Sequence, residues 1–173
     1  MSDSAHTVIM EPRESPTKLA LRAAISSLNR GDLDDAVARF SDAIALDPQC
    51  HEGYSGLGVA RARRREYDLA ADAFGECAKL RPSDPQSRYN YAVALQRAGR
   101  YEDAAAEYLR VLRLQPEHLP AQRALRRLVL AGVVSTVELR CPRCGSRPEL
   151  PQLITCRHCG AGFQVLPVAS AEE

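Results

Sequence analysis

The 173-residue chain has no tryptophan, and aromatic residues make up only 5% of it. Its longest apolar run, from Leu128 to Val134, is too short to cross a bilayer. The N-terminal residues are polar apart from Val8 to Met10, so we expect no secretory signal. A formal net charge of +1 gives no general attraction to nucleic acid or to acidic membranes. We therefore predict no membrane insertion and a cytoplasmic, reducing setting, in which six cysteines do not indicate a disulfide scaffold.

The most informative pattern is a repeat of 34 residues, which places Pro48, Pro82 and Pro116 at equal spacing. Three further columns follow the same period: Phe40, Phe74 and Tyr108; Ala36, Ala70 and Ala104; Leu33, Tyr67 and Tyr101. Ala36, Phe40 and Ile44 share one helical face, which predicts an amphipathic helix in the second half of each repeat. The proline that follows each such helix ends it.

A second helix is expected upstream in every repeat, joined to the first by a tight turn. Gly31 and Gly99 suit a turn residue with positive φ, and Arg65 stands in the same column of the middle repeat. Ser15 before Pro16 and Asp84 before Pro85 have the pattern of an N-cap followed by proline in the first turn.

These columns resemble the tetratricopeptide (TPR) repeat family, whose period is 34 residues. The resemblance implies a mainly α fold, a right-handed superhelical stack of three helix pairs with a capping helix. The cysteines described below add a small β zinc ribbon after it. The predicted organisation is a disordered N-terminal segment, 1–15; a repeat region, 16–132, with repeats at about 17–50, 51–84 and 85–118 and a capping helix at 119–132; a zinc ribbon, 136–168; and a flexible tail, 169–173. We expect the capping helix to expose Arg123, Arg126 and Arg127.

The resemblance also implies a concave groove, lined by the first helix of each pair, that holds a peptide or helix from another protein. The predicted groove residues are Leu21, Ile25, Leu28, Ser55, Val59, Ala62, Arg63, Tyr89, Val93, Gln96 and Arg97. We expect Tyr89 and Val93 to face outward from the core. Apolar residues at inward positions favour an apolar or amphipathic helical ligand over the carboxylate clamp of the chaperone-binding members. The alternative is that these residues contact the N-terminal segment or the ribbon of the same chain.

Four cysteines near the C-terminus form two Cys-x-x-Cys-Gly units. Cys141, Cys144, Cys156 and Cys159 have the spacing of a tetrahedral four-thiolate site, and the flanking segments have strand-like patterns. The segment resembles a zinc ribbon, which predicts one structural Zn²⁺ per chain. Fe in a rubredoxin-like redox site uses the same ligands and stays open as an alternative.

The remaining patterns indicate a non-enzymatic adaptor. No nucleophile or acid–base pair can be named, and Cys50 and Cys77 are expected to be buried small apolar residues. A nucleic-acid-associated or regulatory zinc-ribbon protein is the alternative, because residues 136–168 carry four arginines against two glutamates. No aromatic side chains interleave with these arginines, so nucleic acid is not the expected partner.

Overall fold

A computed structural model of the chain describes residues 14–133, 137–140 and 164–167. These residues form seven helices and two short strands. In chain order they are α1 (Pro16–Arg30), α2 (Leu33–Leu46), α3 (His51–Arg63), α4 (Tyr67–Leu80), α5 (Pro85–Arg97), α6 (Tyr101–Leu114), α7 (Leu119–Leu130), β1 (Val137–Arg140) and β2 (Gln164–Pro167).

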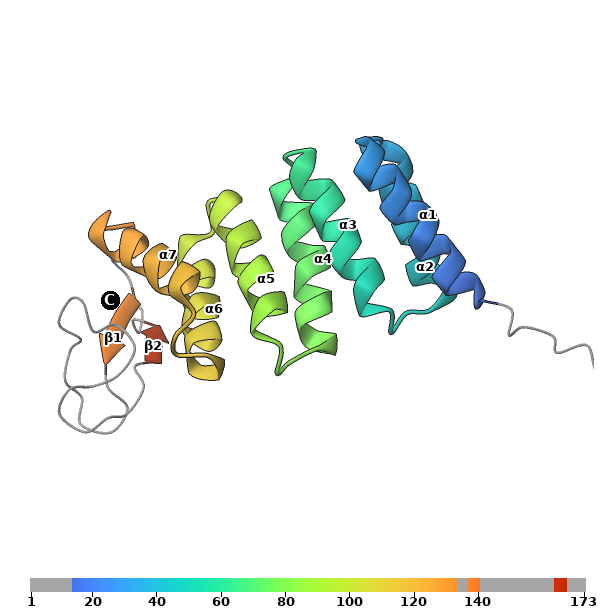
Figure 1. Ribbon diagram of the computed structural model, residues 1–173. Coiled ribbons are helices and arrows are strands. Elements are labelled where there is room, and N and C mark those ends of the chain that lie inside the picture. Colours follow the sequence, from blue (N-terminus) through green and yellow to red (C-terminus); the bar gives the residue numbers. More distant parts are fainter. Residues whose placement is uncertain (1–13, 134–136, 141–163, 168–173) are drawn as a thin grey trace, which may run out of the picture.

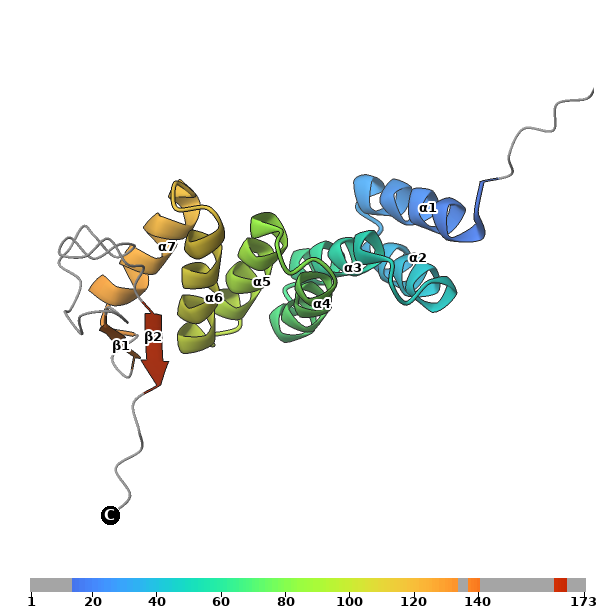
Figure 2. The same cartoon turned by 90° about the horizontal axis from the view of Figure 1, so that it is seen from below.

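The helices form one row of antiparallel pairs, which is the arrangement that the 34-residue period predicts (Figure 1). Helices α1 and α2, α3 and α4, and α5 and α6 pack as pairs, and each pair contacts the next through α2 and α3 or α4 and α5. Helix α7 packs on α6, with the two strands beyond it at the same end of the row (Figure 2). The predicted helix pairs and the seventh helix are therefore confirmed.

The turns inside the three pairs share one backbone geometry, although their residues differ. Gly31 and Gly99 both have φ of +82°, where glycine has no steric penalty. Arg65 takes the same left-handed conformation at φ +64°, and its N–H bonds to the carbonyl of Ala62 at 3.0 Å. A side chain in this region costs about 1–2 kcal/mol. The repeat geometry thus overrides the local preference of Arg65.

Helix starts follow the predicted caps. The side chain of Ser15 accepts a hydrogen bond from the backbone N–H of Lys18 at 3.3 Å, with Pro16 in the first turn of α1. Asp84 accepts from the backbone N–H groups of Gln86 and Ser87 at 3.3 and 3.2 Å. Each interaction satisfies donors that have no partner within the helix.

The core is built from the alanine and aromatic columns of the repeat. Phe40, Phe74 and Tyr108 are all buried, and the alanines of the second helices lie beside them. Close packing on the aromatic rings needs small partners: a Cβ added to Gly58 would lie 2.8 Å from the ring of Phe74. Glycine at position 58 therefore lets α3 approach α4 closely.

Buried apolar residues form two clusters that meet in α4. The smaller cluster joins the first repeat to the second and contains Ala24, Ala36, Phe40, Leu57, Ala60 and Ala73. The larger cluster extends from α4 to α7 and includes Leu95, Tyr108, Leu112 and Leu125. On α7, the exposed side of the helix carries Arg123, Arg126 and Arg127, as expected of a capping helix.

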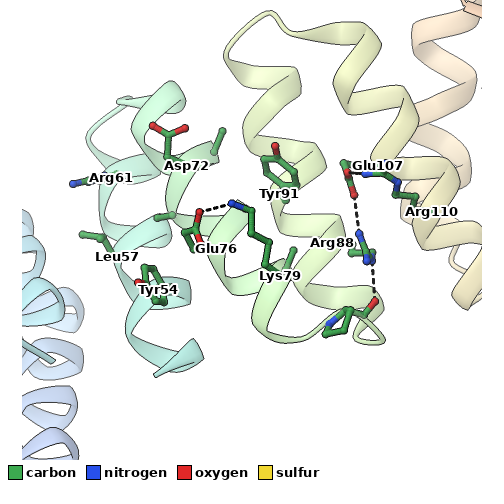
Figure 3. A pocket seen from close by; sticks show the side chains of 15 residues that line it. Tyr54, Leu57, Arg61, Asp72, Glu76, Lys79, Arg88, Tyr91, Glu107 and Arg110 are labelled. Carbon is green, nitrogen blue, oxygen red and sulfur yellow. Dashed lines mark hydrogen bonds and ion pairs between the residues drawn. The ribbon is translucent and has the colours of Figure 1, made fainter. Parts of the chain in front are cut away.

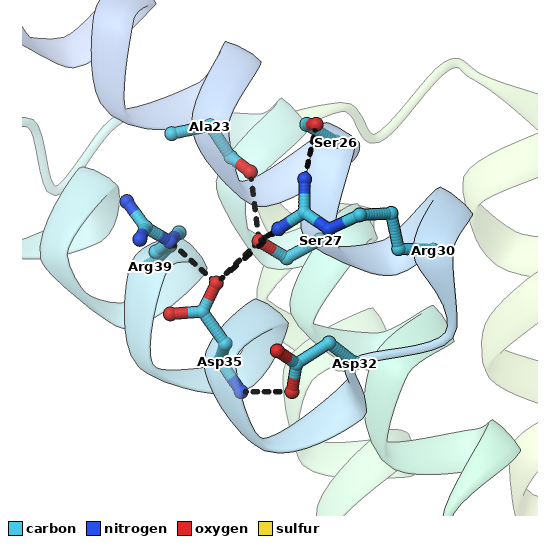
Figure 4. Close-up of polar contacts among 7 residues, drawn as sticks. All are labelled: Ala23, Ser26, Ser27, Arg30, Asp32, Asp35 and Arg39. Atoms are coloured by element: carbon cyan, nitrogen blue, oxygen red, sulfur yellow. Dashed lines mark hydrogen bonds and ion pairs between the residues drawn. The ribbon is translucent and has the colours of Figure 1, made fainter.

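A polar network closes the first repeat (Figure 4). The buried hydroxyl of Ser27 lies within hydrogen-bonding distance of the Ala23 carbonyl, at 3.1 Å, and of the Asp35 carboxylate. Asp35 also accepts from Arg39 at 2.6 Å, while Arg30 donates to Ser27 at 3.1 Å. Because Ser27 is on α1 and Asp35 is on α2, the network holds the two helices together.

The two strands form an antiparallel sheet with Val137 opposite Pro167 and Arg140 opposite Gln164. Strand β2 contacts α6, so the sheet lies against the end of the helical row. The rest of the predicted ribbon, with its four cysteines, lies outside the described residues. Cys50 and Cys77 are free and buried, which confirms their predicted role as small core residues.

Candidate partner-binding groove

A hollow of about 430 Å³ opens between α3 and α5, with α4 behind it. The side chains that line it are Val59, Ala62, Arg63, Tyr67, Phe74, Tyr89, Asn90, Val93, Ala94 and Arg97. Six of the predicted groove residues are among them: Val59, Ala62, Arg63, Tyr89, Val93 and Arg97. The structure thus brings together six of the eight predicted groove residues of the second and third repeats in one cavity.

The wall of this hollow is apolar, and its rim carries charge. Val59 and Val93 stand in the same repeat column, one on each side, and the buried ring of Phe74 lies behind them. Arg63 and Arg97 also share a column, in the last turns of α3 and α5. A cavity with apolar walls and a few polar groups at its rim is the usual form of a ligand pocket.

Tyr89 is fixed in place by two other rings, and it does not face outward from the core as expected. Its ring centroid lies 5.9 Å from that of Tyr108 and 4.8 Å from that of His118. Both Tyr89 and Val93 are half-buried and pack against the larger core cluster. The expectation was wrong because His118 follows the third repeat and covers one side of the tyrosine.

Gln96 and Ser55 do not line the hollow, although both were predicted groove residues. The side-chain oxygen of Gln96 accepts a hydrogen bond of 2.7 Å from the hydroxyl of Tyr108. Burial raises the pKa of the Tyr108 phenol far above its usual value, so the hydroxyl keeps its proton and remains a donor. Gln96 is therefore occupied by a contact within the protein.

The predicted groove residues of α1 lie apart from this hollow. Leu21 and Leu28 are half-buried and pack against the smaller core cluster. Ile25 is 48% exposed and lines a separate hollow of about 450 Å³ on the surface of α1. Arg63 connects the two regions, because its guanidinium donates to the carbonyl of Leu28 at 2.9 Å.

A second large hollow, of about 550 Å³, was not predicted from the sequence (Figure 3). Its side chains come from α3, α4, α5 and α6, and Glu107 is its most buried charge, with 7% of the side chain exposed. Glu107 pairs with Arg88 at 3.3 Å and with Arg110. Arg88 also donates to the Pro82 carbonyl at 3.0 Å, so the buried carboxylate of this hollow and its two arginines are paired within the protein.

Asn90 is the polar groove residue that the sequence analysis missed. It lines the hollow beside Val93 and Arg97, at helical spacings of three and seven residues on α5. That spacing was available in the sequence, since Tyr89 and Val93 had already been assigned to this face. Tyr67 and Phe74 were assigned to packing columns, and the structure shows that they also close the back of the hollow.

The predicted metal ligands, Cys141, Cys144, Cys156 and Cys159, lie outside the described residues. Within the described ranges, no group of three or more histidine, cysteine, aspartate or glutamate side chains is arranged to hold a metal ion. None of the described helices is long and apolar enough to cross a membrane.

Sequence comparison gives the family of the chain. The tetratricopeptide repeat profile matches residues 21–85 and 61–118, which together exceed half of the chain. The chain belongs to the tetratricopeptide repeat family.

Individual relatives are similar over the repeat region. Mouse superkiller complex protein 3 is 29% identical over 119 residues, which are 68% of this chain and 8% of that protein. Human tetratricopeptide repeat protein 28 is 28% identical over 152 residues, or 88% of this chain and 6% of that protein. This chain therefore spans less than a tenth of either relative.

Among solved structures, the first TPR domain of Spaghetti (RPAP3), bound to the HSP90 peptide SRMEEVD, has a similar fold. It superposes with a TM-score of 0.63 at 20% identity, over 68% of this chain and 93% of that one. At this identity the likeness shows the fold alone.

Proposed function

We propose that this protein is a non-enzymatic interaction adaptor that holds a segment of another protein in the hollow between α3 and α5. The single observation that carries the proposal is the hollow itself, whose walls come from three helices of two repeats. A bulky apolar side chain entering it would contact Val59, Phe74 and Val93. Removal of that apolar surface from water is the main source of affinity at a small site.

The rim defines how a partner segment would be oriented. Asn90 offers an amide, and Arg63 and Arg97 offer guanidinium groups on the same edge. Leu21, Ile25 and Val93 occupy inward places where the chaperone-binding members of the family carry the lysine and asparagine of a carboxylate clamp. We therefore favour an apolar or amphipathic helical segment as ligand. Peptide binding by the TPR domain of RPAP3 supports the use of this fold for such a role.

The experiment is site-specific photo-cross-linking combined with a substitution that fills the hollow. A cross-linking amino acid at Asn90 is expected to capture partner peptides, whereas the same amino acid at exposed Asp42 on α2 is not. Ala62→Phe places a ring in the hollow and is expected to abolish the cross-links. Ala38→Phe, on the exposed side of α2, is the matched control. Undiminished cross-linking at position 90 in Ala62→Phe would contradict the groove assignment.

We further propose that the C-terminal region holds one structural Zn²⁺ through Cys141, Cys144, Cys156 and Cys159, as a second interaction module. The pairing of Arg140 with Gln164 supports this proposal, because the segment between them then begins and ends at adjacent positions. A unit of this size cannot bury enough apolar surface to fold alone, so the metal would supply the folding free energy.

Elemental analysis of freshly purified, reduced protein tests the metal proposal. The expected result is one zinc per chain, lost in Cys144→Ser and retained in Cys77→Ser, whose cysteine is buried in α4. Chelation is expected to leave the helical circular dichroism signal nearly unchanged. Two disulfides with no metal would contradict the proposal, and iron with visible charge-transfer absorption would change it to a rubredoxin-like site.

A further inference from the structure

The near-neutral net charge of the protein conceals a strong separation of charge between the two kinds of helix. Helices α1 and α7 each carry three lysine or arginine residues, and α3 and α5 carry two each. The one acidic side chain in these four helices is Glu52. Helices α2, α4 and α6 carry three acidic residues each, with one, one and two basic residues.

Helix stability does not explain this pattern. Acidic residues stabilise the first turn of a helix through its dipole, and α2, α4 and α6 each have at least one there. Helices α1, α5 and α7 have none in the first turn. Basic residues in last turns are expected from the same dipole, but the depletion of acidic residues is not.

The positive charge lies at the groove. Arg63 and Arg97 line the hollow between α3 and α5, and both are exposed. The positive charge extends to Arg127 on α7. The charges of Arg97 and Arg127 both favour the ionised form of the buried Tyr108 phenol and so oppose the rise of its pKa. No carboxylate lines this hollow, in contrast to the hollow around Glu107, which Asp72 and Glu76 also line.

We infer that the groove recognises an acidic segment of a separate protein, in which carboxylates flank one large apolar side chain. The apolar residue enters the hollow against Val59, Phe74 and Val93, and the carboxylates lie opposite Arg63 and Arg97. This inference rests on the proposed function and adds the charge of the ligand to it. Opposite charges across an interface steer association and exclude wrong partners.

The probe is a displayed library of short peptides with a fixed central leucine and random flanks, followed by synthesis of the enriched sequences. The wild-type protein is expected to enrich aspartate and glutamate on both sides of the leucine. Binding of these peptides is expected to weaken about tenfold between ~0.05 M and ~0.5 M salt, since exposed charges are screened.

Charge reversal supplies the matched pair of variants. Arg63→Glu with Arg97→Glu is expected to weaken binding about tenfold or more and to remove its salt dependence. Lys79→Glu with Arg113→Glu makes the same change in net charge on α4 and α6, and is expected to leave binding unchanged. Arg97→Glu alone, at an exposed residue in the last turn of α5, guards against a folding defect caused by losing the Arg63 bond to Leu28. Its melting curve should match that of the wild type.

Three results would overturn the inference. One is enrichment of basic or uncharged flanks, and another is equal weakening by the two double variants. The third is tighter binding of a single-stranded RNA oligonucleotide than of any peptide. If Ala62→Phe abolishes peptide binding while the Arg63 and Arg97 variants do not, the groove stands and only its preference for acid is wrong.

Discussion

The first and third repeats use the same hairpin geometry, but they are closed by different interactions. In the third repeat Leu95 faces a buried cluster that continues through Tyr108 into α7. The equivalent column of the first repeat holds Ser27, whose hydroxyl joins Asp35 and the arginines of the polar network. The difference shows that the repeat requires a closed space between its helices and does not require an apolar one.

The first repeat and the C-terminal end of the row should therefore respond differently to destabilising substitutions. Apolar burial spans four helices at the C-terminal end, whereas the first repeat adds only a small cluster and a polar network. In repeat proteins each unit contacts only its neighbours, so a weak terminal repeat can open while the rest stays folded.

The largest expected effect is that of Tyr108→Ala, which removes a fully buried ring from the larger cluster. The free energy of unfolding should fall by about 3–5 kcal/mol, with hydrogen exchange faster throughout α4 to α7. Phe40→Ala in the same column is the matched variant, and its effect should stay within α1, α2 and the adjoining α3. Equal exchange in α5 and α6 in both variants would mean that the two clusters unfold as one unit.

Ser27→Ala should have a smaller effect, confined to the first repeat. It removes a buried hydroxyl and leaves Asp35 with Arg39 and Arg30 as its side-chain partners, at a cost of about 1–2 kcal/mol. Hydrogen exchange of α1 and α2 measures this cost. Ser26→Ala removes only an exposed hydroxyl that accepts from Arg30 at 2.7 Å, and should change little. Similar results for the two alanine variants would show that the buried hydroxyl of Ser27 contributes no stability.

Arg65→Gly should stabilise the protein by about 1 kcal/mol, because it relieves a side chain from the left-handed region. The turn joins α3 to α4, where the two clusters meet, so the gain should also raise the cooperativity of the thermal transition. Arg64→Gly is the control: Arg64 has φ of −77° and pairs with Asp34 at 2.9 Å and Glu66 at 2.8 Å. It should be destabilising.

Acid should weaken the first repeat slightly and selectively. Hydrogen bonds from Arg39 and Ser27 lower the pKa of Asp35 in the folded state. The stability that this carboxylate contributes is therefore fully present above its pKa in the unfolded state, and it is lost as the pH falls through its pKa in the folded state. The difference in Tm between wild type and Asp35→Asn should therefore shrink from pH ~5 towards pH ~2.5. A constant difference across this range would exclude the carboxylate as the cause.

The sequence predicted the helices well because 34-residue columns constrain spacing, turns and packing at once. Phe40, Phe74 and Tyr108 are buried where the period predicts, and Gly31 and Gly99 form the expected turns. These positions depend on contacts within a repeat or between adjacent repeats. Such contacts recur in every repeat, so the three copies of the sequence pattern predict the same local structure.

Predictions failed where one residue meets a partner outside the pattern. Tyr89 lines the hollow but is partly covered by His118. Gln96 accepts from Tyr108 and does not line the hollow. The pairing of Arg88 with Glu107 also has no counterpart in the other repeats. These contacts depend on three-dimensional distances between side chains that have no fixed sequence spacing.

Helix α7 begins at Leu119, 34 residues after the start of α5 at Pro85. It thus occupies the place of the first helix of a fourth repeat, while β1 lies in the stretch where the matching second helix would follow. Duplication of one internal repeat would lengthen the array without altering either end. Each added copy would bring one more hollow and one more position in the Arg63 column. The length of the segment that such a protein binds can therefore change by gene duplication alone, in steps of one repeat.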